Sequence, residues 1–270
     1  MKMFFLYSFI GFLFGYLFFR KKNLCVEDVK KIDNEEKDFS HAVIHELRAY
    51  LTNLNWIFEK LLDKGLGNYT EEQYSAISSG RGMVENANNL VNDTLNAISV
   101  GRTEARFKYK LNDINKLIED IISEYSLISK ERKISLSFVR SSMPIPLFFF
   151  DNSQMYIAIH DLVHNSMKYT HDGGKVSIKS ELLGEKVKIT IEDNGIGIPS
   201  KDKNKIFTKF FRADNAKKIH GDGSGLGLYI SKNIIKKHKG DIEIFSEEGR
   251  GTKVEITLPL VKTEPKDNLN

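Results

Sequence analysis

Apolar residues in the first hundred positions follow two helical patterns. Between residues 38 and 63 they step by alternating threes and fours, as in a coiled-coil seam: Ile44, Leu47, Leu51, Leu54, Phe58 and Leu61. The glycines of GLGNYT interrupt this pattern, and Thr70 with Gln73 forms a capping box that predicts a second helix. That helix repeats apolar residues every seven positions from Ile77 to Ile98. We expect a helical hairpin whose exposed seams pair two copies as a four-helix bundle.

Beyond residue 106 the pattern changes to alternating strands and amphipathic helices. Strands are predicted at 106–111, 133–139, 175–182, 186–193, 241–247 and 252–260, and helices at 112–129, 153–169 and about 225–238. The first of these helices is expected to open at Asn112 or Asp113, and Gly184 is expected to turn a hairpin. Together they predict an α/β sandwich with a mixed sheet, so the fold class is α+β.

The N-terminus departs from both patterns. Met3 to Phe19 is 17 residues without a formal charge, and Arg20, Lys21 and Lys22 follow at once. This predicts an uncleaved, single-pass transmembrane helix in the cell membrane, because the apolar run is too long for a signal peptide and no cleavage site follows. The basic flank predicts that the catalytic part is cytoplasmic. Only two residues precede the span, so we expect no extracellular sensor domain.

Six segments follow from these patterns. We expect a transmembrane anchor at 1–22, a juxtamembrane connector at 23–37, the dimerising hairpin at 38–100, a linker at 101–106, a catalytic domain at 107–261 and a disordered tail at 262–270. The net charge of +4 gives no strong case for nucleic-acid binding, and the single cysteine, Cys25, excludes an internal disulfide framework.

His45 is the first candidate for chemistry. On a helix it lies about 150° from the seam, so it is predicted to face outward rather than into a core. A zinc-protease helix would need a second histidine at position 49, which is alanine. A neutral imidazole is a good nucleophile, and Glu46 could accept its proton, but this reading requires an electrophile from elsewhere in the chain.

Three motifs in the second half are suited to a nucleotide. In DNGIGIP, Asp193 can accept a hydrogen bond from an exocyclic amine, and Gly195 and Gly197 allow close approach of a flat base. The glycine-rich GDGSGLGLYI precedes a helix, which is typical of a phosphate cradle. In HDLVHNSMKYT, Asp161 and Asn165 share a helix face and offer oxygens to Mg²⁺, and Lys168 adds positive charge.

With these motifs in order, the chain resembles the sensor histidine kinases of two-component systems. FSHAVIHELRAYLTNL is similar to their phosphoacceptor box, and DLVHNSMKYT, DNGIGI, IFTKFFR and GSGLGL are similar to the boxes of their ATP-binding domain. The resemblance spans Phe39 to about Pro259. It implies a membrane-anchored homodimer that binds Mg-ATP, transfers the γ-phosphoryl group to His45 and passes it to an aspartate in the receiver domain of a response regulator.

The resemblance also implies residue roles. Asp193 would recognise adenine, Asn165 would hold Mg²⁺, and Tyr169 would flank the base. Lys168 and Arg212 would contact phosphates, and residues 200–222 would form a mobile lid anchored by three phenylalanines. The phosphate loop would be shaped by Gly223, Gly225, Leu226 and Gly227.

The chain departs from the family pattern in two places. Ala49-Tyr50 stands where the family commonly has Thr-Pro, and an alanine side chain cannot hydrogen-bond a water, so we expect weak phosphatase activity toward the regulator. Asp161 stands where asparagine is usual, as a further metal ligand or as a base for slow ATP hydrolysis. Two alternatives remain open: an ATPase of the same nucleotide-binding superfamily, and a nucleotide-binding dimeric scaffold without phosphotransfer.

Overall fold

The computed structural model describes residues 47–63, 69–101, 107–219 and 223–263, which form two compact units, Met1–Val91 and Asn92–Asn270. The predicted anchor and connector, His45, Glu46, positions 102–106 of the linker and the end of the tail lie outside the described residues. Within the described ranges, no helix has the length and apolar character needed to cross a membrane.

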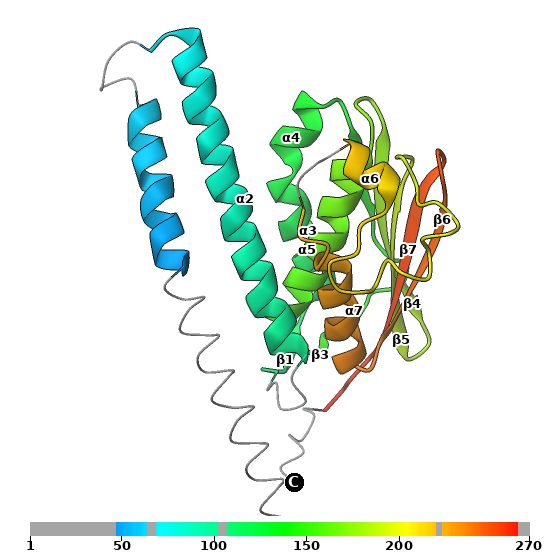
Figure 1. The fold of residues 1–270 in the computed structure, drawn as a ribbon. Helices are drawn as coiled ribbons and strands as arrows, with labels where there is room; N and C mark the ends of the chain where they lie inside the picture. Colours follow the sequence, from blue (N-terminus) through cyan, green and yellow to red (C-terminus); the bar gives the residue numbers. More distant parts are fainter. Residues whose placement is uncertain (1–46, 64–68, 102–106, 220–222, 264–270) are drawn as a thin grey trace, which may run out of the picture. The chain divides into compact units, whose positions relative to one another are not determined.

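The first unit contains a helix at 47–62 and most of α2, Glu71–Gly101 (Figure 1, blue and cyan). The predicted capping box is confirmed: the N–H of Thr70 donates to Gln73 Oε1 at 3.0 Å, and the N–H of Gln73 donates to Thr70 Oγ1 at 3.2 Å. The helices approach closely at Gly80, where an added Cβ would lie 2.7 Å from the Phe58 ring. The two helices predicted for the hairpin therefore pack against each other.

The second unit is built on a five-stranded mixed sheet in the order β2-β4-β5-β7-β6. Only β2 and β4 are parallel, and the other neighbours are antiparallel. The β-hairpin predicted around Gly184 is formed by β4 and β5, and φ at Gly184 is +61°. The strands are β2 Ser135–Val139, β4 Lys175–Leu183, β5 Lys186–Asp193, β6 Asp241–Glu247 and β7 Gly251–Pro259.

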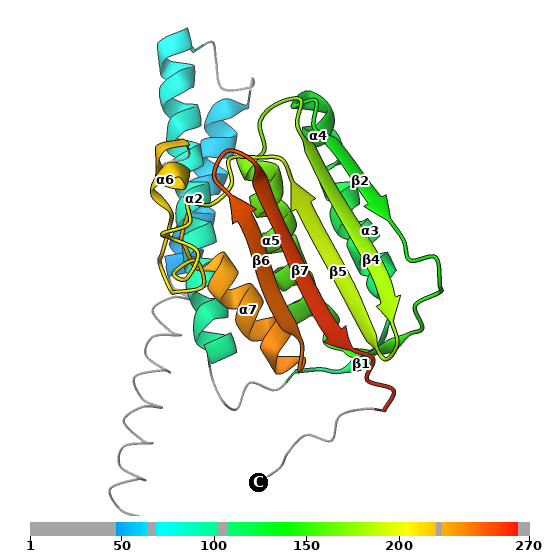
Figure 2. The same ribbon diagram turned by 90° about the vertical axis from the view of Figure 1, so that its right-hand side faces the viewer.

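Helices cover one face of this sheet (Figure 2). They are α3 Ile114–Glu124, α4 Ser126–Glu131, α5 Asn152–Tyr169 and α7 Gly227–Lys237. Alternate residues of β5, Val187, Ile189 and Ile191, are fully buried under them, while the intervening side chains are more exposed. This alternation is the pattern that predicted the strand, and it fixes which face of the sheet receives the helices.

Two elements were missed, two strands (β1 and β2) are shorter than predicted, and the helix expected at 112–129 is divided into α3 and α4. The strand expected at 106–111 is β1, Lys110–Asn112, which pairs antiparallel with the missed β3, Phe148–Phe150. Three consecutive phenylalanines are too short a run to show a periodicity, although Phe148 and Phe150 are buried. The second missed element, α6, Asp214–Ile219, lies in the expected lid and buries none of its residues, so it carries no apolar pattern.

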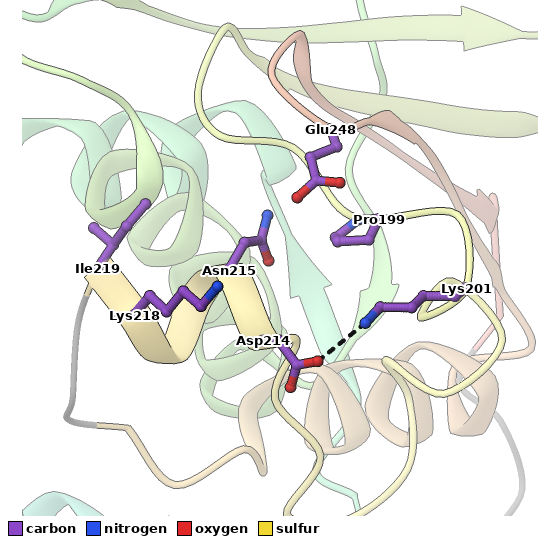
Figure 3. Close-up of a pocket in the computed structure, with 7 residues that line it drawn as sticks. All are labelled: Pro199, Lys201, Asp214, Asn215, Lys218, Ile219 and Glu248. Carbon is purple, nitrogen blue, oxygen red and sulfur yellow. Dashed lines mark hydrogen bonds and ion pairs between the residues drawn. The ribbon is translucent and has the colours of Figure 1, made fainter.

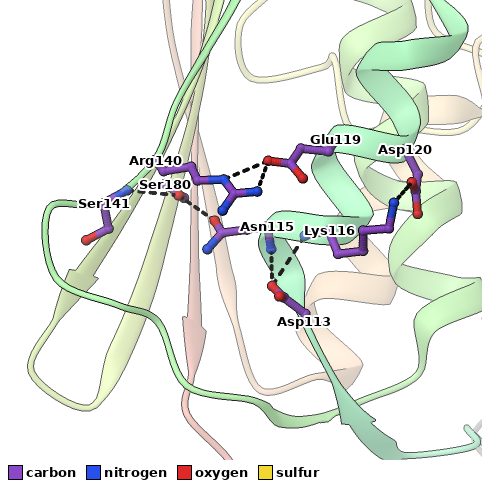
Figure 4. A network of polar contacts seen from close by, with 8 residues as sticks. All are labelled: Asp113, Asn115, Lys116, Glu119, Asp120, Arg140, Ser141 and Ser180. Atoms are coloured by element: carbon purple, nitrogen blue, oxygen red, sulfur yellow. Dashed lines mark hydrogen bonds and ion pairs between the residues drawn. The ribbon is translucent and has the colours of Figure 1, made fainter.

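Polar contacts at the start of α3 join it to the sheet (Figure 4). Asp113 is the N-cap, with Oδ1 accepting from the N–H of Asn115 at 2.8 Å and of Lys116 at 3.3 Å. The buried Ser180 of β4 donates from Oγ to Asn115 Oδ1 at 2.7 Å. Asp113 is therefore the helix start that the sequence left open between two residues.

His238 forms a buried polar contact at the end of α7. Its Nε2 accepts the N–H of Asp151 at 3.1 Å, and its Nδ1 lies 2.8 Å from the carbonyl oxygen of Ile234. These partners fit a neutral imidazole with its proton on Nδ1, and burial lowers the pKa of His238. Asp151 itself caps α5 by accepting the N–H of Gln154 at 3.1 Å. One neutral histidine thus ties α7 to the start of α5.

Candidate nucleotide-binding site

The C-terminal half of α5 presents four of the predicted site residues. Its apolar face, including Leu162, Val163 and Met167, is buried. The predicted residues lie on the remaining face and are partly exposed: Asp161, Asn165, Lys168 and Tyr169. The helix that the sequence predicted therefore leaves these side chains beside the sheet rather than within its core.

Asp193 ends β5 as a buried carboxyl group. Its Oδ1 accepts the N–H of Gly195 at 2.9 Å and of Thr252 at 3.2 Å. Burial raises the pKa of Asp193, and hydrogen bonds from Gly195, the Ser166 side chain and Thr252 oppose that rise. Ser166 comes from α5, so Asp193 lies against the helix that carries Asn165. Neither Ser166 nor Thr252 was predicted as a site residue from the sequence.

Gly195 and Gly197 are required by the protein's own packing. A Cβ on Gly195 would lie 2.3 Å from the carbonyl oxygen of Tyr169, and one on Gly197, where φ is +63°, would lie 1.9 Å from that of Glu247. The N–H of Ile196 donates to the carbonyl of Tyr169 at 3.1 Å. The loop after Asp193 is therefore held between the end of α5 and the β6–β7 turn.

The glycine-rich segment shapes the start of α7. Gly223 and Gly225 have φ of +131° and +69°, and Gly227 begins the helix. The Oγ of Ser224 accepts the N–H of Leu226 at 3.1 Å. A Cβ on Gly227 would lie 3.4 Å from Asp161 Oδ2, so the predicted phosphate loop and the predicted metal-binding face of α5 are adjacent.

Arg212 also lies beside this loop. Its Nη1 donates to the carbonyl of Gly223 at 3.4 Å. Phe210, which precedes it by two residues, has φ of +62°, and its backbone would contact a Cβ placed on Gly225 at 2.7 Å. Phe207 packs under the Nζ of Lys232 on α7 at 4.5 Å. The predicted IFTKFFR box is therefore packed on the glycine-rich loop and on α7.

Pairwise contacts thus link the predicted residues of α5, the end of β5, the glycine-rich loop and Arg212. His45 and Glu46 lie outside the described residues. Besides Ser166 and Thr252, sequence reasoning missed Ser224, which stood unassigned inside a motif, and Asp93, which accepts a hydrogen bond from it. Asp93 had no sequence signal, because its position in the helical pattern is that of an ordinary polar residue.

A separate cavity of about 420 Å³ lies next to α6 (Figure 3). Lys201 Nζ and Asp214 Oδ2 are 3.1 Å apart at its edge. The Nδ2 of Asn215 donates to the carbonyl of Gly197 at 2.9 Å, which ties α6 to the loop after Asp193. Its lining contains none of the predicted site residues: Pro199, Lys201, Asp214, Asn215, Lys218, Ile219 and Glu248. This cavity is therefore distinct from the predicted nucleotide contacts.

Comparison with known proteins gives this arrangement a family. Residues 150–262 match the family of histidine kinase-, DNA gyrase B- and HSP90-like ATPases. Sensor protein kinase WalK of Staphylococcus aureus is 33% identical over 260 residues, which is 95% of this chain and 61% of that relative. The same protein from strain NCTC 8325 is longer, and the match covers 41% of it. The chain therefore spans between two fifths and three fifths of these relatives.

Several solved structures share the fold. The catalytic domain of histidine kinase ThkA is 26% identical, with a TM-score of 0.51 over 57% of this chain and 97% of that one. Full-length ShkA in complex with AMPPNP is 22% identical, with a TM-score of 0.68 over 84% of this chain and 47% of that one. ThkA in complex with the response regulator TrrA is 21% identical, with a TM-score of 0.58 over 82% and 60%.

The ShkA and ThkA–TrrA structures agree, at the level of fold, with the family match over residues 150–262. The motifs, the mixed sheet with helices on one face and the match over residues 150–262 point to one family. Residues 150–262 therefore carry a domain of the histidine kinase-, DNA gyrase B- and HSP90-like ATPase family, and the chain is similar in sequence to a sensor protein kinase.

Proposed function

We propose that this protein is an ATP-dependent histidine kinase that phosphorylates itself on His45. The observation that carries the proposal is the contact between two predicted motifs: Asp161 of α5 lies against Gly227, where the glycine-rich loop begins α7. The N–H groups at this helix start can bind phosphates. ShkA was solved with AMPPNP, a precedent for an adenine nucleotide on this fold.

Asp193 is proposed to recognise the adenine amine. One of its oxygens accepts two backbone N–H groups, which fixes the orientation of the carboxyl group. Tyr169 is proposed to flank the base, since its backbone is bonded to the loop that follows Asp193. Gly195 and Gly197 maintain that loop through the close contacts described above.

Lys168 and Arg212 are proposed to contact the phosphates, and Asn165 with Asp161 to hold Mg²⁺. The two metal-ligand candidates lie one helical turn apart on α5. In the described part of the chain, no group of three or more His, Cys, Asp or Glu side chains could hold a metal ion, so phosphate and water oxygens would complete the coordination. Mg²⁺ bound there would neutralise charge on the phosphates.

The proposed reaction is an in-line phosphoryl transfer. A ring nitrogen of His45 forms a bond to the γ-phosphorus as the bond from that phosphorus to the β–γ bridging oxygen breaks, which releases ADP. Glu46 accepts the imidazole proton. The phosphoryl group then passes to an aspartate carboxylate in the receiver domain of a response regulator. ThkA, solved with the response regulator TrrA, is a precedent for that partner.

The hairpin is proposed to pair two chains as a four-helix bundle, with residues 1–22 as a membrane anchor and the catalytic part in the cytoplasm. Apolar side chains on the first helix support the pairing, because Leu47, Leu54 and Ile57 are each more than two fifths exposed in the single chain. Ala49 cannot position a water through its side chain, so phosphatase activity toward the regulator is proposed to be weak.

Incubation of the 270-residue chain with γ-labelled ATP tests this function. We expect acid-labile label on the wild-type chain, none on His45→Gln and little on Asp193→Asn. Release of free phosphate without labelled protein would instead indicate an ATPase, and nucleotide binding with neither would indicate a scaffold. Phosphate release from a labelled response regulator at the rate of Thr-bearing relatives would contradict weak phosphatase activity.

A further inference from the structure

A carboxylate near the C-terminal end of α2 contacts the glycine-rich loop. From Asn92 onward, α2 belongs to the same compact unit as the candidate site, and Ala97 and Val100 are buried in that unit's core. Ser224 Oγ donates to Asp93 Oδ2 at 2.5 Å, a short hydrogen bond to a charged acceptor. Ser224 Oγ also accepts the N–H of Leu226. One hydroxyl therefore joins α2 to the turn that begins α7.

This contact places an anion where nucleotide phosphates are proposed to bind. The start of α7 favours negative charge, and the partly buried Asp93 supplies it through Ser224. A second carboxylate, Asp161, lies against Gly227. Burial raises the pKa of Asp93, the hydrogen bond from Ser224 lowers it, and the charge of Asp161 raises it further. A triphosphate bound here would add more negative charge beside both carboxylates.

We propose that Asp93 is an autoinhibitory phosphate mimic. Its carboxylate accepts the hydrogen bond of the Ser224 hydroxyl and repels the phosphates of an incoming nucleotide, and we call this Asp93–Ser224 contact the latch. This inference rests on the proposed function, since it takes the glycine-rich loop to be the phosphate site. Asp93 is presented by a packed helix end, so a change in α2 that withdraws it raises nucleotide affinity. By linkage, bound nucleotide weakens the Asp93–Ser224 contact to the same extent.

The test compares dissociation constants of the 270-residue chain and its Asp93→Asn variant for AMPPNP, ADP and adenosine, with and without MgCl2. We expect Asp93→Asn to bind AMPPNP about tenfold more tightly, as for one like charge removed a few ångströms from phosphates in a partly solvated site. ADP should gain less, and adenosine, which has no phosphate, should bind unchanged. Equal AMPPNP affinity of variant and wild type overturns the latch.

Asp241→Asn is the matched control. It removes the same charge from an exposed position beyond the other end of α7, where Asp241 Oδ1 lies 2.7 Å from Lys236 Nζ, and it should leave AMPPNP affinity unchanged. If Asp241→Asn raised AMPPNP affinity as much as Asp93→Asn, the effect would come from net charge alone, and this would overturn the latch. Weaker AMPPNP binding by Asp93→Asn only when Mg²⁺ is present would make Asp93 a metal ligand and overturn it too.

Ser224→Ala completes a double-mutant cycle. If the hydrogen bond is part of the latch, the gain from Asp93→Asn is smaller in the Ser224→Ala background, and strictly additive effects overturn that role. Thermal melts of each variant confirm folding. If neither the wild type nor any variant binds nucleotide, the proposed function fails and the latch with it. Nucleotide binding without a difference at Asp93 removes the latch alone.

Discussion

Replacing Gly197 by alanine should disrupt the loop after Asp193 by two separate effects. The first is backbone conformation, because φ at Gly197 is +63°, and an L-residue held there loses about 1 to 2 kcal/mol. The second is a collision, because the new Cβ would lie 1.9 Å from the carbonyl oxygen of Glu247, whereas ordinary contacts begin at 3.4 Å. The β6–β7 turn must therefore move away.

The structure allows the second effect to be sized. Two hydrogen bonds join the loop to this turn and to the end of β6: the N–H of Gly249 donates to the carbonyl of Ile196, and the N–H of Ile198 donates to Ser246 Oγ, both at 2.8 Å. Losing both costs about 2 kcal/mol, at roughly 1 kcal/mol each. The total for Gly197→Ala is then about 3 to 4 kcal/mol, or roughly 10 °C in melting temperature for a unit of this size.

Gly184→Ala separates the two effects. Gly184 has φ of +61°, almost that of Gly197, but nothing lies within 4 Å of an added Cβ. It should cost only about 1 kcal/mol, since the strain is partly offset by reduced freedom of the unfolded chain. Melting and urea unfolding followed by circular dichroism measure both variants. Equal destabilisation of Gly184→Ala and Gly197→Ala would refute the close packing inferred at the loop.

Three further changes test the scaffold. Burial lowers the pKa of His238, so the stability that this histidine contributes should be full above about pH 6.5 and decline as the pH falls toward the folded-state pKa. Urea unfolding at pH 7.5 and 5.5 should therefore show a loss of unfolding free energy of up to about 1.4 kcal/mol. The His238→Gln variant should lack this loss. Asp113→Ala removes the α3 cap and should cost about 1 kcal/mol in urea unfolding, whereas Asp113→Asn should cost less. Thr70→Ala should speed amide exchange in the first turn of α2, and unchanged exchange would contradict the capping box.

The sequence determined the elements whose signal is local. The alternation in β5, the capping box at Thr70 and the turn at Gly184 were predicted from neighbouring residues and are present in the structure. Such features follow from contacts a few positions apart, which a short window of sequence contains. The motif residues of α5 could be placed on one face for the same reason, since a helix repeats every 3.6 residues.

Only the tertiary structure decided what long-range packing controls. β3 is a strand because β1, 38 positions earlier, pairs with it, and its three phenylalanines have no periodicity of their own. Gly197 is needed because Glu247 lies against it, and Ser224 and Asp93 meet although 131 positions separate them. The sequence thus determined which residues are predicted to carry the chemistry, and the fold decided which carboxylate lies at the glycine-rich loop, since that choice depends on contacts between distant segments.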